Sequence, residues 1–125
     1  MADDIWPSEI RLVADRQALL VRFDDRLLTL PAELLRVESP SAEVRGHSPA
    51  EKKLVPGKSG VRIKAVEAVG NYAVRLTFDD GHSTGIYGWA YLAELGRDPN
   101  GLVRQYRDGL AAAGLSHEPL PPRFG

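Results

Sequence analysis

The chain has 125 residues, a formal net charge of −1 and no cysteine, which suits one soluble globular domain. The lack of cysteine excludes disulfides, thiolate nucleophiles and cysteine-ligated zinc or iron–sulfur sites. The near-neutral charge gives no argument for binding nucleic acid or a membrane surface, and the acidic N-terminus lacks the features of a signal peptide, so we expect a cytoplasmic protein.

Two segments of the chain, residues 10–35 and 63–92, have the same order of expected elements. Each reads as a strand, a turn, a second strand, a turn with two aspartates, a short third strand and a short helix. Phe-Asp-Asp stands at the same place in both, as residues 23–25 and 78–80. We therefore predict an α+β fold, a single domain with two small antiparallel β-meanders (about six strands, pseudo-duplicated) and two or three short helices.

The helices are expected at the end of each segment and again near the C-terminus. In the second segment we expect Trp89 to lie in the core and Tyr87 to be partly exposed. The last helix is expected to begin near Asn100, which can cap its N-terminus, and Gly114 can end it.

The whole chain, residues 1–125, is predicted to be one domain, with a core at about 8–113 and a loose tail at 115–125. Between the two repeats, residues 39–60 carry few signals for helix or strand, and so long a loop in a small domain is either functional or mobile. Residues 44–64 hold six basic residues and one acid, a net charge of +5, which leaves −6 on the rest of the chain. This segment is either a solvated charged loop or a site for an anion or an acidic partner, bound through Arg45, His47, Lys52, Lys53 and Lys58.

Two separated stretches resemble the DUF971 family, which is also named for the N-terminal domain of gamma-butyrobetaine hydroxylase. They are LPAELLRVESPSAEVRGH, residues 30–47, and NYAVRLTFDDGHSTGIYGWAYLAELG, residues 71–96, and the resemblance extends over about residues 8–110. In that family the domain occurs alone in many bacteria, and it is also found fused to an oxygenase domain or to iron–sulfur carrier ATPases. The resemblance implies a non-catalytic binding or accessory domain whose protein partner is a metabolic enzyme or an iron–sulfur carrier ATPase.

The resemblance also implies where a metal would lie. Hydroxylase-type members hold a structural zinc with three cysteines and one histidine that follows an acidic turn. His82 matches that histidine, whereas Ser39, Ser41 and Val44 stand at the positions of the cysteines. Since serine is a poor zinc ligand and valine is none, we expect no cofactor. The alternative is a metal-binding domain in which His82 holds zinc or iron together with donors recruited from His47, Asp79, Asp80 or Glu43.

Catalysis has little support in the sequence. A 2-oxoglutarate oxygenase needs two histidines and one carboxylate around its iron, but no carboxylate stands two residues after His82. Asp79 and Asp80 are adjacent in a turn, where aspartates cap backbone amides more often than they form an acid–base pair. We therefore expect no enzyme activity. The third hypothesis, after the accessory domain and the metal-binding domain, is an enzyme that acts on a small anion at the basic segment.

Overall fold

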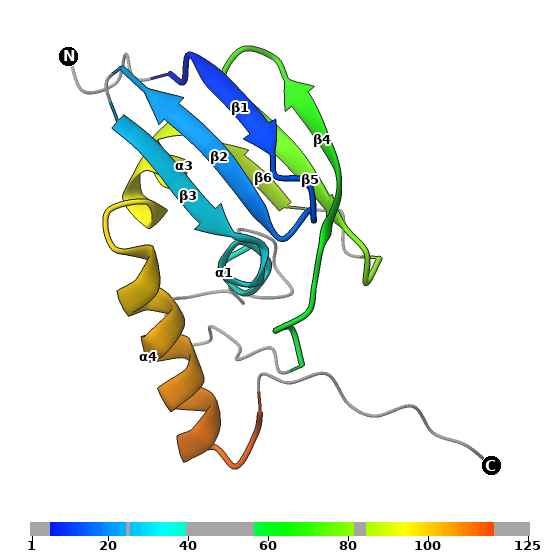
Figure 1. Ribbon diagram of the computed structural model, residues 1–125, viewed down its shortest axis with the longest axis vertical. Helices are drawn as coiled ribbons and strands as arrows, with labels where there is room; N and C mark the ends of the chain where they lie inside the picture. Colours follow the sequence, from blue (N-terminus) through cyan, green and yellow to red (C-terminus); the bar gives the residue numbers. More distant parts are fainter. Residues whose placement is uncertain (1–5, 25, 40–56, 82–84, 117–125) are drawn as a thin grey trace.

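A computed structural model describes residues 6–24, 26–39, 57–81 and 85–116. Its strands form two antiparallel three-stranded sheets, in the orders β1-β2-β3 and β4-β5-β6. The strands are β1 (Glu9–Leu12), β2 (Ala18–Phe23), β3 (Arg26–Pro31), β4 (Ile63–Val69), β5 (Ala73–Phe78) and β6 (Gly85–Gly88). The sheets lie one in front of the other, with the second behind the first in Figure 1. The predicted α+β fold with two meanders is confirmed.

The two halves of the described fold repeat one another. Helix α1 (Ala32–Val37) follows β3 directly, and α3 (Trp89–Leu95) follows β6 directly. The middle strands β2 and β5 have six residues each and end on the phenylalanine of the two Phe-Asp-Asp triplets. The repetition in the sequence therefore corresponds to a repeated unit of three strands and one helix.

A longer helix, α4 (Pro99–Ala112), follows α3 and lies along one side of the molecule (Figure 1). Its N-cap is Asp98, whose Oδ1 accepts a hydrogen bond from the backbone N–H of Gly101 at 3.1 Å. The predicted cap, Asn100, lies inside the first turn instead, because Pro99 occupies the first helical position and fits it well. The backbone turns left-handed at Gly114, with φ of 74°, and the helix ends there as predicted.

The hydrophobic core lies between the two sheets, because apolar side chains alternate along the strands toward one face. The first sheet contributes Leu19, Val21 and Leu30, and the second contributes Leu76 and Phe78, all fully buried, among others.

The expectation for the two aromatic residues at the end of the second unit was wrong. Tyr87 is fully buried, while Trp89 is only partly buried and packs against the edge of the core. The reason is register: Tyr87 pairs with Val74 on the inward face of the sheet. Strand β6 has only four residues and begins and ends with glycine, so its sequence contains no alternation from which this could be predicted.

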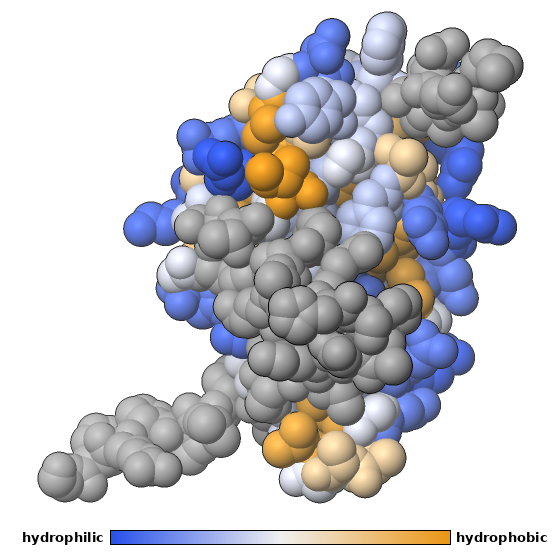
Figure 2. Space-filling model, turned by 180° about the vertical axis from the view of Figure 1, so that it is seen from behind, coloured by the Kyte–Doolittle hydropathy of each residue, from blue (hydrophilic) through white to orange (hydrophobic). Residues whose placement is uncertain are grey.

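Large apolar side chains that stay exposed are spread over different parts of the fold: Trp6, Leu27, Tyr72, Ile86 and Leu115. Seen from the back of Figure 1, hydrophilic residues dominate the rim of the surface, with a compact hydrophobic patch near its upper left (Figure 2). Within the described residues, none of the helices has the length and apolar character that a membrane crossing requires.

Candidate functional site

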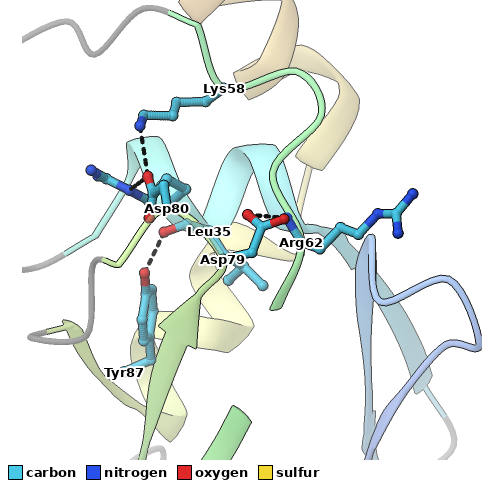
Figure 3. A network of polar contacts seen from close by, with 7 residues as sticks. Leu35, Lys58, Arg62, Asp79, Asp80 and Tyr87 are labelled. Carbon is cyan, nitrogen blue, oxygen red and sulfur yellow. Dashed lines mark hydrogen bonds and ion pairs between the residues drawn. The ribbon is translucent and has the colours of Figure 1, made fainter. Parts of the chain in front are cut away.

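Most of the predicted site residues lie outside the part of the chain that the structure describes, so their predicted roles stay predictions. They are His82, Ser41 and Val44 of the matched metal positions, Glu43 of the possible extra donors, and Arg45, His47, Lys52 and Lys53 of the basic segment. The others are described: Ser39, Lys58, Asp79 and Asp80. Ser39 lies just after the C-terminal end of α1. Asp79 and Asp80 lie in the turn that follows β5, with Lys58 beside Asp80 (Figure 3).

Asp80 joins three segments that are distant in the sequence. Its Oδ2 lies 2.8 Å from Nε of Arg36 in α1 and 2.6 Å from Nζ of Lys58, which precedes β4 (Figure 3). The Arg36 side chain is only 5% exposed and that of Asp80 is 21% exposed, so this contact is weakly screened by solvent. The positive charge of Lys58 is therefore compensated within the fold.

Asp79 extends the pairing of β4 and β5 beyond the ends of both strands. Its Oδ1 accepts a hydrogen bond from the backbone N–H of Arg62 at 3.1 Å, and its own N–H donates to the Arg62 carbonyl at 2.9 Å. The turn closes at Gly81, whose φ of 93° suits glycine. The carboxylate at Asp79 therefore serves a backbone amide, as the turn residues predict.

Two tyrosines close the C-terminal end of α1, where backbone carbonyls lack helical partners. The Tyr87 hydroxyl donates to the carbonyl of Leu35, and the Tyr91 hydroxyl donates to the carbonyl of Glu38 at 2.5 Å. Burial raises the pKa of Tyr87, and a side-chain hydrogen bond with Ser39 opposes that shift. Both phenols are therefore donors that hold α1 against the second repeat.

The sequence analysis did not find these contacts. The available signal was the spacing of Tyr87 and Tyr91, four residues apart, which suggests one helical face. The two residues instead straddle the junction between β6 and α3, so the spacing has no helical meaning there.

Of the four matched zinc positions, the structure describes only Ser39, and this residue does not suit a tetrahedral zinc site. A structural zinc needs four nitrogen, thiolate or carboxylate donors, whereas Ser39 offers a neutral hydroxyl that bonds to Tyr87. The space beside it is filled as well, because a Cβ added at Gly85 would lie 2.6 Å from Ser39 Oγ. Among the residues that the structure describes, no group of three or more potential His, Cys, Asp or Glu ligands comes together.

A shallow pocket of about 400 Å³ opens elsewhere, between the end of α1, α3 and the start of α4. Its lining combines one aromatic ring, two leucines and four charged residues: Glu38, Tyr91, Glu94, Leu95, Arg97, Asp98 and Leu102. One of these carboxylates, that of Asp98, already caps α4. The lining includes none of the described residues of the basic segment.

Comparison with known proteins agrees with this fold. A family model described as "Gamma-butyrobetaine hydroxylase-like, N-terminal" matches residues 10–93. No curated protein sequence matches the chain.

Solved structures with similar folds include two determined by solution NMR. One is 41% identical with a TM-score of 0.81, covering 97% of this chain and 96% of the other; the second is 43% identical with a TM-score of 0.79, covering 97% and 91%. A crystal structure of a protein of unknown function from Acidithiobacillus ferrooxidans, which belongs to the DUF971 family, is 39% identical with a TM-score of 0.61 and covers 73% and 92%.

The fold and these matches define a small α+β domain of a hydroxylase-like N-terminal family. The chain belongs to the gamma-butyrobetaine hydroxylase-like N-terminal domain family. The similar crystal structure is that of a member of the DUF971 family. The family resemblance predicted from the sequence is confirmed.

Proposed function

We propose that this chain is a non-catalytic accessory domain that acts by binding a protein partner, without a resident metal. The single observation that carries the proposal is that polar side chains around the turn after β5 form hydrogen bonds and ion pairs within the fold. Asp79 serves a backbone amide and Asp80 is paired with two cations, while the Tyr87 hydroxyl bonds to a carbonyl of α1. Groups engaged in this way hold the fold together and are poorly placed to transfer protons to a substrate.

The family supports the same reading by association. The matching model describes an N-terminal domain of a hydroxylase-like protein, and the fusions expected for the family place the domain beside catalytic or iron–sulfur carrier modules. A metabolic enzyme or an iron–sulfur carrier ATPase is therefore the partner class that we propose. This step rests on family organisation, because fold alone does not specify function.

The test is to find the partner and rebuild the complex from pure components. Cross-linking in the native host, with an affinity tag on this chain, would nominate partners by quantitative mass spectrometry. Each nominee would then be purified and mixed with the untagged chain, and the complex measured by analytical ultracentrifugation. We expect a defined complex at micromolar concentration. Turnover of a small molecule by the chain alone, or the absence of a complex with every nominee, would overturn the proposal.

The competing hypothesis, a metal held at His82, is tested on the same protein. Elemental mass spectrometry of untagged chain, purified without chelators, is expected to find no stoichiometric zinc or iron, because the matched positions Ser39, Ser41 and Val44 provide no good ligands. About one equivalent of metal per chain, lost in the His82→Ala variant, would establish the metal-binding alternative.

A further inference from the structure

Two irregularities of the backbone meet at the start of β4. Arg16, in the turn between β1 and β2, has a φ of 62°, a left-handed conformation that is uncommon for a residue other than glycine. The register of β4 against β5 shifts between Ile63 and Ala65, so that Lys64 is the extra residue of a β-bulge. Bulges change the direction in which a side chain points and are frequent near functional sites.

Hydrogen bonds join these two irregularities directly. The Arg16 carbonyl accepts the backbone N–H of Ile63 at 2.8 Å, and Arg16 Nη1 donates to the carbonyl of Lys64 at 2.8 Å. The guanidinium is thus held in place beside β4 while its charge remains, because a carbonyl is neutral. Such backbone strain persists only where the surroundings enforce it, and it often marks a functional position.

Arg62 and Lys64 add two further positive charges on either side of Ile63. Both are exposed, whereas Ile63 is fully buried, so the two cationic side chains face solvent. The Arg62 side chain extends away from the Asp79 carboxylate, which bonds to the Arg62 backbone instead (Figure 3). In the described part of the chain, no ion pair forms at Arg16, Arg62 or Lys64.

Lys58 shows what a paired cation looks like in the same region. Its ammonium lies 2.6 Å from Asp80 and its side chain is 20% exposed, so its positive charge is compensated by Asp80 within the fold. The three cations at the start of β4 differ in being exposed and uncompensated by a described carboxylate. They therefore keep the capacity to pair with an acidic group from outside.

We propose that Arg16, Arg62 and Lys64, here called the β4 basic surface, dock an acidic segment of the protein partner. This inference rests on the proposed function and adds the chemistry of recognition to it. A guanidinium that is already fixed loses less conformational entropy on binding than a free side chain. A nucleic acid is disfavoured, because the chain outside residues 44–64 carries a charge of −6 and would repel a long polyanion.

The proposal is tested with a short fluorescein-labelled peptide of alternating glutamate and serine, measured by fluorescence anisotropy at low salt. The double variant Arg62→Gln/Lys64→Gln removes two charges of the surface. Since two exposed ion pairs, each individually weak, would be lost, we expect binding to weaken by about 2- to 30-fold. The matched control is Arg26→Gln/Arg104→Gln, which changes the net charge equally at exposed sites on β3 and α4 and should weaken binding by less than about 2-fold.

A third variant separates binding from folding. Asparagine tolerates the left-handed conformation, so Arg16→Asn should keep the turn while it removes the guanidinium. We expect it to weaken peptide binding and leave the circular dichroism spectrum unchanged.

Three results would overturn the docking proposal. They are equal losses in the surface and control variants, no binding of the peptide to the wild-type chain, and tighter binding of a single-stranded RNA than of the peptide.

The same variants distinguish this inference from the proposed function. If Arg62→Gln/Lys64→Gln still forms the rebuilt complex with the purified partner at wild-type affinity, the β4 basic surface is not the docking site, while the accessory function stands. If the wild-type chain forms no complex with any nominee, the accessory function fails as well.

Discussion

The hydroxyl of Tyr87 should contribute measurably to the stability of the domain. It is fully buried, it donates to the Leu35 carbonyl and its oxygen accepts a side-chain hydrogen bond from Ser39. In Tyr87→Phe the ring still fills its place in the core, but the carbonyl and the serine hydroxyl lose their common partner. Leaving buried polar groups unsatisfied costs about 1–3 kcal/mol, so we expect a loss of that size in the free energy of unfolding.

Urea denaturation followed by circular dichroism would measure the loss, and thermal unfolding should show a decrease of Tm by about 3–6 °C per kcal/mol for a domain of this size. Tyr72→Phe is the matched control, because Tyr72 is 60% exposed; a change within about 0.5 kcal/mol is expected there.

A double-mutant cycle sharpens the test. Ser39→Ala and Tyr87→Phe remove two ends of one hydrogen bond, so their effects should not be additive, and a coupling of about 0.5 kcal/mol or more is expected. A Tyr87→Phe protein as stable as the wild type, or strict additivity with Ser39→Ala, would refute the reasoning that this buried network holds α1 to the second repeat.

Three further predictions follow from the same region and from α4. Asp80→Asn should cost about 2 kcal/mol in urea denaturation, since it removes the carboxylate charge that lies 2.8 Å from Nε of the nearly buried Arg36. Glu9→Gln, at an exposed ion pair, should cost less than about 0.5 kcal/mol, and equal losses would contradict the argument. Gly85→Ala should lose about 1–3 kcal/mol through overpacking, because the new Cβ would lie 2.6 Å from a buried oxygen, and an unchanged Tm would count against that. Burial, with a contribution from a nearby carboxylate, raises the pKa of Tyr106 from 10.0 to about 12; the folded state therefore holds a proton that the unfolded chain releases, and stability should fall from pH 10 to pH 12 and fall less steeply in Tyr106→Phe.

Much of the candidate site was not predictable from the sequence. The acidic turn at Asp79 and Asp80 was recognised, and Asp79 does serve a backbone amide. The role of Asp80 as partner of Arg36, 44 residues away, has no local signal. The same holds for the hydrogen bond of Tyr87, whose carbonyl partner Leu35 lies 52 residues away.

The repeated unit of three strands and a helix was determined by the sequence alone, because alternation of apolar residues, turn-forming aspartates and helix-ending glycines are local properties. Which polar groups meet was decided only by the tertiary structure, when the two sheets packed on a common core. Arg16 reaches the carbonyl of Lys64, 48 residues away, only because the first turn of one sheet lies against the first strand of the other. Contacts at such separations depend on the packing of the whole domain, and no short stretch of sequence contains them.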